Sequence, residues 1–516
     1  MKILVCFKAG PEFEQVVDDD WEGFSLESDL SYVKRVFGCF DETALETAPR
    51  LAGALRERGR HAECAALTLG PLPSPLLRTL FAVGFDRVRA LPPDTGGLPW
   101  EFHPEETAAA LEAVIAGGGW DLILAGQQAG YADTGMVPLI LAERLGLPAI
   151  TGAELVSIPE DSAADILIER SGENGRERLG VRLPAMAIMG NSPVAALRAA
   201  TLAAQMKAAG RQAEWLSVKA PPGAAPALIR DVARKDCRFF AGAEDLAREW
   251  GDFARSAAPR SRAGGLPEFA AFIRGGGARK VWVPGASDLD RLEERWGEER
   301  PDFALFPAAW SEAAIRLCAR LGCSCFPGVT SLRREGPLLL GRKKVCGSNL
   351  DWEFPIEPPA ALVFSGRGFS LEDAGLNRAD RRPPWLVSRE TLDPPSANPL
   401  ENARLVFAAG RGLGSKLACG RLERIAARYG AVLGFSRPAA LNGWGAISRI
   451  IGQSGIKIQA EFCLAAGVSG AAAFMAGLNP GARLVAVNPD RNAPIFRYAD
   501  AGLVMSAGEF MDVFEG

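Results

Sequence analysis

Hydrophobic and polar positions along residues 1–222 form an alternation of short apolar runs and longer amphipathic segments. Apolar runs that end at Gly or Pro predict buried strands, and amphipathic segments predict helices. The predicted strands are residues 2–7, 61–69, 87–91, 121–125 and 185–189, and the predicted helices are residues 41–58, 75–83, 104–116, 134–145 and 193–209. This order predicts an α/β protein with a doubly wound parallel sheet.

Residues 150–190 depart from this alternation. Residues 166–170 and 179–183 flank the turn Glu173-Asn174-Gly175-Arg176, which predicts an antiparallel hairpin. Residues 221–226, Pro-Pro-Gly-Ala-Ala-Pro, are typical of a linker.

The pattern then starts again. Apolar runs at 280–283 and 303–306 and a helix at 311–321 predict a second, smaller α/β unit, followed by a β-rich piece at 341–349 and 361–364. Residues 303–307 echo residues 121–125, so the two sheets are expected to be related. The Pro- and Arg-rich residues 371–399 predict a connector.

The last hundred residues combine buried strands with Gly/Ser clusters. Apolar runs at 405–407 and 484–487 predict strands of a parallel sheet buried on both faces. Gly/Ser clusters occupy residues 410–415, 434–437, 452–455 and 467–470. Where such a cluster precedes a helix, free backbone N–H groups and the positive helix end favour a phosphate. One cluster could serve plain chain reversal, but several together predict a bound nucleotide.

Composition narrows the function classes. The 516 residues are 48% hydrophobic and 23% charged, with a net charge of −4, which predicts a soluble globular protein of several domains. The sequence has no basic stripe for nucleic acid and no apolar run of the roughly 18 residues that span a membrane. Its first residues lead into a strand, unlike a signal peptide. Ten scattered cysteines indicate a reducing cytoplasm, and only two histidines argue against a metal site.

A polar loop follows the predicted strand 121–125. Gln127 and Gln128 lie at its carboxyl end, and Asp133 and Thr134 precede the next helix. Open α/β sheets bind ligands at this position. Taken alone, Asp133 or Thr134 is better explained as the N-cap of that helix.

The C-terminal motifs resemble the FAD-binding domain of the electron transfer flavoprotein α subunit. They are, in order, Gly410-Arg411-Gly412-Leu413, Ser436-Arg437, Gly452-Gln453-Ser454-Gly455, Gly467-Val468-Ser469-Gly470, Val487-Asn488-Pro489-Asp490, Ala493-Pro494-Ile495-Phe496 and Ala499-Asp500. The resemblance implies a Rossmann-like FAD-binding domain at residues 403–516.

Residues 1–222 resemble the β subunit of the same family. The matching motifs are Phe40-Asp41-Glu42-Thr43-Ala44, Ala82-Val83-Gly84-Phe85-Asp86-Arg87 and Gly126-Gln127-Gln128-Ala129. Residues 236–370 resemble a shortened N-terminal domain of the α subunit, through Arg342, Gly347, Asn349 and Arg367. The resemblance implies a natural fusion, β before α, of two related sheets of the adenine-nucleotide α-hydrolase type and the FAD-binding domain, with a connector at 371–402.

The resemblance also implies an FAD site. Its residues would be Arg411, Ser436, Arg437, Ile451, Gly452, Gln453, Ser454, Gly455, Ser469, Gly470, Ala471, Ala472, Ala473, Phe474, Asn488, Asp490 and Ser506. Arg437 would lie at the N1/C2=O edge of the flavin, where a guanidinium stabilises the negative charge of the reduced ring and so favours one-electron chemistry. The alternative for Arg437 is a surface salt bridge.

Other roles follow from the same resemblance. Arg411 and Ser436 would hold the nucleotide part, Ser469 the phosphate and ribityl oxygens, and Asn488 the adenosine end. Gln453 and Ser454 would reach the ribityl chain and N5, with Ser454 in place of the usual Thr.

Two departures from the family pattern concern the same site. Phe474 replaces a His that donates to the flavin C2=O, which is expected to lower the flavin potential. Ser506 replaces an acidic residue, which is expected to weaken the adenosine contact.

A second nucleotide pocket is implied in the β-like part. Its residues would be Cys6, Cys39, Phe40, Gly126, Gln127, Asp133 and Thr134. Tyr131 replaces a family Asp, so AMP, a second FAD and an empty pocket all stay open.

The resemblance predicts an electron carrier. Its FAD would accept electrons from a partner dehydrogenase and pass them to a quinone-linked or other acceptor oxidoreductase. Residues 191–194 depart from the family's partner loop, so the donor stays open. The alternatives are an NADH-oxidising, electron-bifurcating flavoprotein with two FADs, and a nucleotide-binding module without a redox role.

Overall fold

The computed structural model describes residues 1–516 except 17, 22–23, 26–27, 93–99, 129–133, 161–162, 173–174, 194–195, 219–226, 230–234, 256–265, 276–279, 337, 347–349, 365–382, 394–397, 480 and 516. The chain divides into two compact units. Unit 1 comprises Met1–Arg230, Ala263–Cys346 and Leu350–Pro395, and unit 2 comprises Asp231–Arg262, Gly347–Asn349 and Ser396–Gly516. Tyr131, Asp133, Gly347, Asn349, Arg367 and the predicted linker 221–226 lie outside the described residues.

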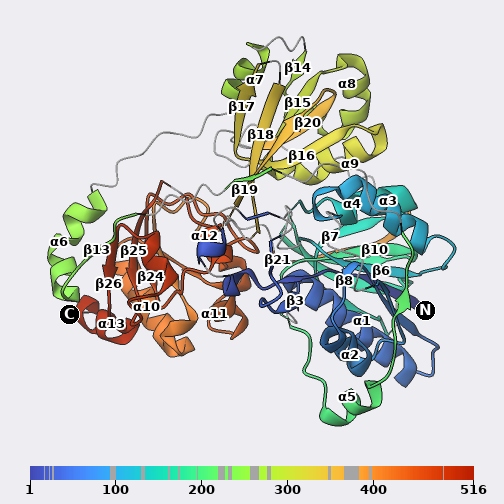
Figure 1. Ribbon diagram of the computed structural model, residues 1–516, viewed down its shortest axis with the longest axis horizontal. Helices are drawn as coiled ribbons and strands as arrows, with labels where there is room; N and C mark the ends of the chain where they lie inside the picture. Colours follow the sequence, from blue (N-terminus) through green and yellow to red (C-terminus); the bar gives the residue numbers. More distant parts are fainter. Residues whose placement is uncertain are drawn as a thin grey trace. The chain divides into compact units, whose positions relative to one another are not determined.

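Unit 1 is built on the N-terminal sheet, which contains ten strands among the described residues (Figure 1). Their order is β11-β5-β4-β1-β6-β10-β7-β8-β9-β21. The bounds are β1 (Lys2–Cys6), β4 (Glu63–Pro71), β5 (Arg87–Leu91), β6 (Leu122–Gly126), β7 (Ala149–Ser157), β8 (Ile166–Gly172), β9 (Gly175–Val181), β10 (Ala185–Met189), β11 (Glu214–Trp215) and β21 (Leu386–Asp393).

Alternating side chains of the parallel strands face two layers of helices. Ile3 and Val5 pack in one apolar cluster, and Leu4 and Cys6 pack in another. In Figure 1, α1 (Cys39–Glu57), α2 (Ser74–Val83) and α5 (Leu202–Ala208) lie on one side of the sheet, and α3 (Pro104–Ile115) and α4 (Val137–Leu145) on the other. Burial on both faces explains why these strands are continuous apolar runs.

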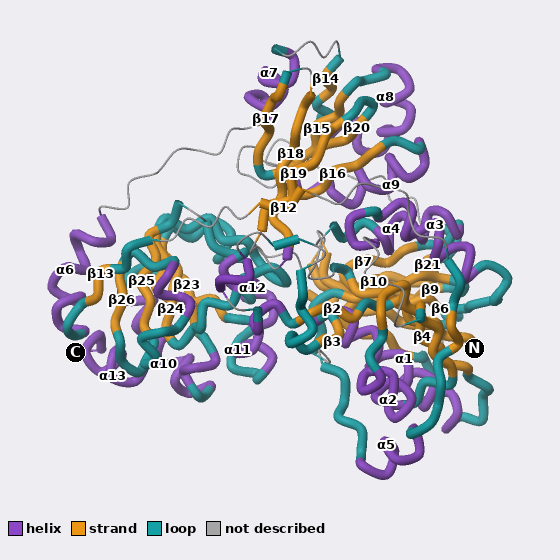
Figure 2. Tube along the Cα trace, viewed as in Figure 1, coloured by secondary structure: helices purple, strands orange, loops and turns teal. Residues whose placement is uncertain are grey.

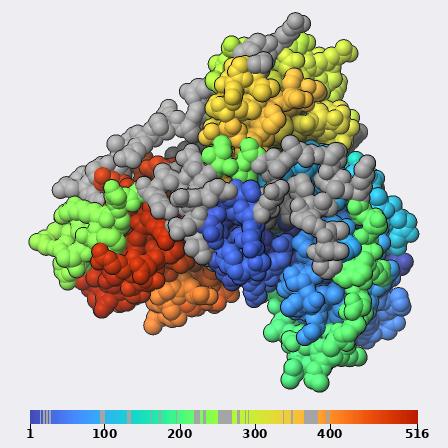
Figure 3. Space-filling view, in the orientation of Figure 1, coloured from blue at the N-terminus to red at the C-terminus, as the bar shows by residue number. Residues whose placement is uncertain are grey.

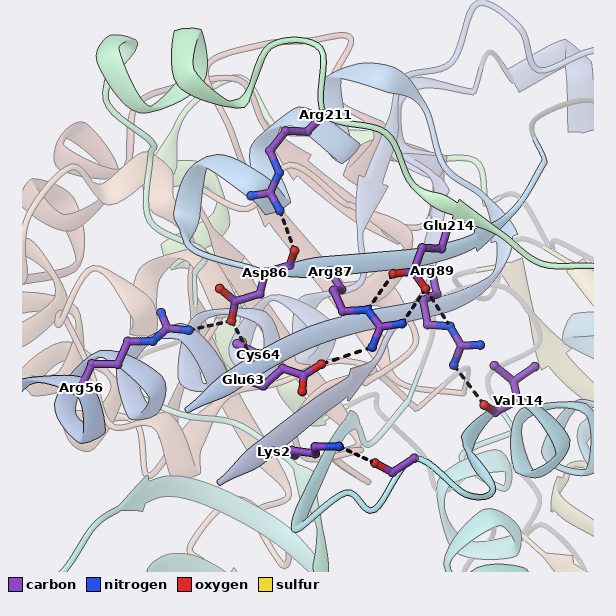
Figure 4. A network of polar contacts seen from close by, with 11 residues as sticks. Lys2, Arg56, Glu63, Cys64, Asp86, Arg87, Arg89, Val114, Arg211 and Glu214 are labelled. Carbon is purple, nitrogen blue, oxygen red and sulfur yellow. Dashed lines mark hydrogen bonds and ion pairs between the residues drawn. The ribbon is translucent and has the colours of Figure 1, made fainter. Parts of the chain in front are cut away.

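The free edge of the parallel part is held by charged side chains (Figure 4). Arg87 donates to Glu214 of β11 at 2.6 Å and to Glu63 of β4 at 3.3 Å. Asp86 accepts hydrogen bonds from Arg56 at 2.6 Å and from the Cys64 N–H at 2.8 Å. The Arg87–Glu214 pair fixes the short β11 to β5, and the other contacts hold the start of β5 to β4 and α1.

The α/β class predicted from the sequence is confirmed, and so is the antiparallel pairing of β8 with β9. The predicted helix 193–209 is wrong at its start, because described helix begins only at Leu202. Before it, Leu197 and Ala200 pack on the core and the Arg198 N–H donates to buried Glu46 at 3.0 Å. These tertiary contacts hold the segment in a non-helical conformation.

The predicted connector 371–399 contains an unexpected strand. β21 pairs antiparallel with β9, and Arg389 forms an ion pair with buried Glu177 at 2.9 Å. Its partner strand lies some two hundred residues earlier in the chain, so no local pattern predicted the pairing.

A second part of unit 1 carries two smaller sheets, shown as strands in Figure 2. The small parallel sheet has the order β14 (Val281–Trp282), β15 (Phe303–Pro307), β20 (Ala360–Phe364), β16 (Ser324–Val329). The antiparallel sheet has the order β12 (Ala227–Ile229), β19 (Leu350–Ile356), β18 (Leu338–Val345), β17 (Ser331–Glu335). The helices of this part are α7 (Leu266–Arg274), α8 (Leu292–Glu299) and α9 (Ser311–Leu321). Phe303, Val329 and Phe354 belong to the apolar cluster that joins the two sheets.

Unit 2 contains the C-terminal sheet, which is parallel throughout the described residues. Its order is β13 (Arg238–Phe239), β26 (Ala501–Leu503), β25 (Arg483–Val487), β24 (Phe462–Ala466), β22 (Leu405–Ala409), β23 (Val432–Phe435). Its helices are α6 (Ala243–Arg255), α10 (Lys416–Arg428), α11 (Arg437–Leu441), α12 (Ala472–Met475) and α13 (Ala507–Glu515).

Residues 238–255 correct a predicted boundary, because they belong to unit 2 and not to the predicted domain 236–370. β13 extends the C-terminal sheet, and Phe240 and Leu246 pack in one cluster with Phe510. Lys235 also forms an ion pair with Asp500 at 2.6 Å. In Figure 3 the light green surface of α6 lies against the red surface of the C-terminal residues.

Candidate cofactor site

The strand order of the C-terminal sheet changes direction at β22. From β22 the chain moves to β23 on one side, then returns to β24 on the other side of β22. The chain therefore continues from β22 and from β24 toward opposite sides of the sheet, and open α/β sheets bind ligands at such a switch point.

Glycines allow these two loops to touch through their backbones. The Gly410 N–H donates to the Ala466 carbonyl and the Gly412 N–H donates to the Gly467 carbonyl, each at 2.9 Å. A Cβ atom at Gly410 would overlap the Gly467 carbonyl oxygen, and Gly467 itself has a φ of +64°. Side chains other than hydrogen are excluded here for steric and conformational reasons.

The loop after β23 places Ser436 and Arg437. The Ser436 N–H donates to the Ala409 carbonyl at 2.9 Å, and its side chain is buried. Ser436 is the N-cap residue of α11, which begins at Arg437 with Pro438 in its first turn. Proline favours the backbone conformation of a first helical turn. It therefore helps to fix the backbone of Arg437, whose side chain is partly exposed.

Residues 451–455 are joined to the helix start that follows β24. The Ile451 N–H donates to the Phe435 carbonyl at 2.8 Å, and the Gln453 N–H donates to the Ala473 carbonyl at 2.7 Å. Gly452 has a φ of +138°, and a Cβ there would lie 2.6 Å from the Ala473 carbonyl oxygen. Gln453 and Ser454 are thereby brought beside Ala471, Ala472 and Ala473 in space.

Asn488 and Asp490 shape the loop after β25. The Asn488 amide donates to the Val468 carbonyl at 3.0 Å and accepts from the Asp490 N–H at 2.9 Å. Asp490 in turn accepts from the Asn492 N–H at 2.9 Å. Ser469 stays exposed, and its carbonyl accepts from the Ile495 N–H at 3.0 Å next to Gly470.

Phe474 and Ser506 have structural roles that the sequence did not reveal. Phe474 is 5% exposed and packs in an apolar cluster with Ile451 and Val468. The Ser506 hydroxyl accepts from the Glu509 N–H at 3.2 Å and donates to the Glu509 carboxylate at 2.8 Å, which caps α13.

The residues at this edge fit a phosphate-bearing cofactor. Polar side chains follow three different strands of one parallel sheet, so they share its carboxyl edge. Arg411 follows β22, Ser436 and Arg437 follow β23, and Ser469 follows β24. Guanidinium, hydroxyl and backbone N–H groups donate hydrogen bonds, which the oxygens of phosphates and ring carbonyls accept.

Unit 1 has a separate pocket with a volume of about 150 Å³. It opens at the carboxyl ends of β1, β4 and β6. Cys6, Gly126, Gln127 and Thr134, four of the residues predicted for the second site, line it. Cys39 and Phe40 are not among its described lining residues. They lie in the first turn of α1 beside Asp41, which does line the pocket.

Asp41 also lines the pocket, although the sequence indicates it only as part of the motif Phe40-Asp41-Glu42-Thr43-Ala44. Its side chain is 4% exposed, and the N–H groups of Lys8 and Gly126 hydrogen bond to it. Burial raises the pKa of Asp41 to about 7, against the opposing charge of Lys8. Burial also raises the pKa of the neighbouring Cys6 thiol to about 12, with a smaller contribution from Asp41.

The rest of the pocket wall is mainly apolar. Leu67, Trp100, Leu111, Met136 and Met186 line it. The wall suits a flat ring better than a highly charged group. Trp100 had no distinguishing signal in the sequence.

Thr134 is not the N-cap of the following helix. α4 begins at Val137, and its N-cap residue is Met136. The Met136 N–H lies 3.5 Å from the Thr134 hydroxyl. The cap explanation favoured for this position is therefore wrong for Thr134, and Asp133 lies outside the described residues.

Two kinds of feature are absent from the described part of the chain. It contains no group of three or more His, Cys, Asp or Glu side chains that could hold a metal ion. It also contains no helix long and apolar enough to cross a membrane.

Comparison with known proteins gives the family. The model of the "Electron transfer flavoprotein domain" matches residues 31–221, and that of the "Electron transfer flavoprotein FAD-binding domain" matches residues 399–479. The second match supports a flavin cofactor.

Curated relatives agree with these matches. The chain is 33% identical over 227 residues to the putative electron transfer flavoprotein subunit YgcQ of Escherichia coli K12, an alignment that covers 42% of this chain and 78% of the relative. It is 35% identical over 255 residues to protein FixB of Salmonella typhimurium, covering 45% of this chain and 81% of the relative. The chain belongs to the electron transfer flavoprotein family, and it carries the electron transfer flavoprotein domain and the FAD-binding domain in one polypeptide.

Proposed function

We propose that this chain is an electron carrier that holds one FAD at the carboxyl edge of the C-terminal sheet. The observation that carries the proposal is the change of strand order at β22, in the segment that matches the FAD-binding domain. A change of strand order is the usual ligand position in such sheets. The donor-rich loops around it support a cofactor with phosphates and ring carbonyls.

Bound FAD supplies the electron-transfer chemistry, and the protein binds the cofactor and tunes it. We assign Arg411 and Ser436 to the nucleotide part of FAD and Ser469 to its phosphate and ribityl oxygens. Gln453 and Ser454 are assigned to the ribityl chain and flavin N5. Their shared loop is tied to Ala473, which supports a fixed position for both.

Arg437 is assigned to the N1/C2=O edge of the flavin ring. A guanidinium keeps its charge at any physiological pH and offers planar donors, so it stabilises negative charge that builds up there. The fixed start of α11 supports this role, because a preorganised donor needs little rearrangement.

The loop after β25 is assigned a positioning role. The Asn488 side chain joins this loop to the Val468 carbonyl after β24, and Asn488 and Asp490 accept backbone N–H groups within the loop, which supports their holding backbone groups toward the adenosine end. The Ser506 hydroxyl is engaged with Glu509, so its contribution to adenosine binding is expected to be small. Phe474 offers no hydrogen-bond donor to the flavin in place of the family His.

Family membership supports two partners. We infer that a dehydrogenase donates electrons to this flavin and that a quinone-linked or other oxidoreductase accepts them, in the cytoplasm.

The pocket of unit 1 favours a second ligand, an adenine nucleotide. Its mainly apolar wall suits a purine ring, and Gln127 and Thr134 supply polar groups at its rim. AMP and the adenosine part of a second FAD would both meet these requirements, and the two ligands give different functions.

The test is the absorption spectrum of the purified chain, with released FAD and AMP counted per polypeptide. One FAD with one AMP supports the electron carrier. Two FADs, together with bleaching by NADH, would replace it with the electron-bifurcating function. A colourless chain that binds AMP or ATP, and takes up no added FAD, would leave a nucleotide-binding module and overturn the redox proposal.

A further inference from the structure

Three cysteines gather where α9 ends and β16 begins. Cys318 lies in the last turn of α9, Cys323 lies directly before β16, and Cys325 lies within it. Gly322 ends the helix in a left-handed conformation with a φ of +66°, and the Cys323 N–H donates to the Cys318 carbonyl at 3.2 Å. In this type of helix end, the side chains that correspond to Cys318 and Cys323 meet each other.

The thiol groups are in contact. The Cys318 thiol is hydrogen bonded to the thiols of Cys323 and Cys325. Cys318 is 2% exposed and Cys325 is 5% exposed, whereas Cys323 is only partly buried. Solvent therefore reaches the trio through Cys323.

We propose that Cys318 and Cys323 form an oxidisable dithiol, which a hydroperoxide converts to a disulfide. This modification site is separate from the flavin and nucleotide sites and does not depend on the proposed function.

The reaction balances with one peroxide per disulfide. The Cys323 thiolate attacks a peroxide oxygen, the O–O bond breaks, and the leaving hydroxide is protonated to water when hydrogen peroxide is the oxidant. The Cys318 sulfur then attacks the sulfenic sulfur of Cys323, the S–O bond breaks, and a second water leaves with the Cys318 proton. The two sulfurs lose two electrons and the peroxide gains them.

Cys318 is favoured over Cys325 as the partner of Cys323. The contact of the Cys318 and Cys323 thiols is set by the helix end. Residues two apart in an extended chain have Cα atoms about 6.6 Å apart, near the upper limit for a disulfide.

The reaction is expected to be slow at neutral pH. The hydrogen bond to the Cys318 thiol and then burial raise the pKa of Cys323 well above its usual value. Only the thiolate attacks, so the rate should rise about tenfold per pH unit below that pKa.

The disulfide would join the end of a helix that holds two parts of unit 1 together. Arg320 and Arg316, which flank Cys318, donate to Glu143 of α4 at 2.9 Å and 3.3 Å. Oxidation would fasten the last turn of α9 to β16 next to this contact.

The test uses the full chain with its cofactors, treated with hydrogen peroxide at pH 7 and pH 9 and then blocked and digested with trypsin. Cleavage after Arg316, Arg320 and Arg333 separates residues 317–320 from residues 321–333. The expected product is a linked pair of these two peptides, with a mass two hydrogens below their sum. It should form at least tenfold faster at pH 9 and disappear after dithiothreitol.

Fragmentation identifies the partner. Cys325→Ser should still give the linked pair, and Cys318→Ser should abolish it and leave Cys323 as a sulfinic or sulfonic acid. Two results would overturn the proposal. One is a disulfide within peptide 321–333, and the other is a native chain that keeps free thiols at both Cys318 and Cys323 after the peroxide treatment. The mass readout on the unmutated chain needs no flavin, so failure of the flavin site leaves it interpretable.

Discussion

At the scale of single residues, burial changes the chemistry of Asp41. The protein places a carboxyl group in an apolar pocket wall and gives it two backbone donors. Its pKa of about 7, raised from 3.8, means that the folded chain keeps a proton that the unfolded chain releases. Between these pH values the folded state binds more protons, so stability falls as pH rises through this window.

Asp41→Asn should remove this pH dependence. The amide oxygen can still accept the Lys8 and Gly126 N–H groups, and it carries no charge to bury. We expect the variant to gain up to about 4 kcal/mol relative to the native chain between pH 4 and pH 8, from about three pKa units. Urea unfolding at several pH values measures the gain, with Asp393→Asn at an exposed carboxylate as control. Equal pH dependence in Asp41→Asn and the native chain would contradict the assignment.

Arg437→Gln tests the charge beside the flavin. Losing a charge-assisted interaction of about 1.5–3 kcal/mol should lower the one-electron potential by roughly 65–130 mV. Redox titration of the purified flavoprotein measures it, and Arg437→Lys should fall between the two. Arg404→Gln is the control, because Arg404 precedes β22 at the opposite edge of the same sheet and pairs with Glu461. Identical potentials for Arg437→Gln and Arg404→Gln would remove Arg437 from the flavin edge.

At the scale of elements, function depends on how strands end. The C-terminal sheet brings the loops that follow its strands to one edge because the strands are parallel. These loops contain many glycines because their backbones contact one another. The closest contact is between the loops after β22 and β24. The motif at Gly410 could be recognised in the sequence, but its contact with Gly467 could not.

Gly410→Ala should break this contact. The added methyl group would overlap the Gly467 carbonyl. This carbonyl belongs to the backbone, so it cannot move aside without distorting the loop. We expect a loss of about 2 kcal/mol or more in stability and weaker FAD retention. Gly420→Ala in α10 is the matched control, because a Cβ there meets open space and alanine favours a helix by about 1 kcal/mol. Thermal unfolding and flavin release would be measured together, and a Gly410→Ala chain as stable as Gly420→Ala would refute the steric argument.

At the scale of the whole molecule, the two units are interleaved along the chain. The chain leaves unit 1 for unit 2 at Asp231–Arg262, returns, and enters unit 2 again at Ser396–Gly516. The first visit supplies β13 and α6 to a sheet otherwise formed by the C-terminal residues. The two units therefore cannot be separated by a single boundary in the sequence.

Residues 396–516 expressed alone should fold poorly. They would expose the part of the core that Phe240 and Leu246 cover, and Asp500 would lose its ion pair with Lys235. Linking residues 231–262 to the fragment should raise its melting temperature by several degrees and restore FAD binding. The same linked segment with Phe240→Ser and Leu246→Ser is the control. Equal melting temperatures with and without the segment would show that it adds no stability.

The sequence alone determined the features that depend on neighbouring residues. The strand at 87–91 and that at 185–189 were predicted with the observed bounds, because a buried strand needs only a local apolar run. The Gly/Ser loops were predictable for the same reason, since left-handed turns and helix starts select their residues locally. Their order along the chain was enough to indicate the family, which the comparisons confirmed.

Only the tertiary structure decided which distant segments meet. β21 joins β9, β13 joins β26, and residues 197–200 lie on a core instead of forming helix. Strand pairing and burial depend on partners hundreds of residues away, and a local pattern contains no record of them. The proton on Asp41 has the same origin. It depends on the buried surroundings that folding builds around this carboxyl group, so residue type alone could not predict it.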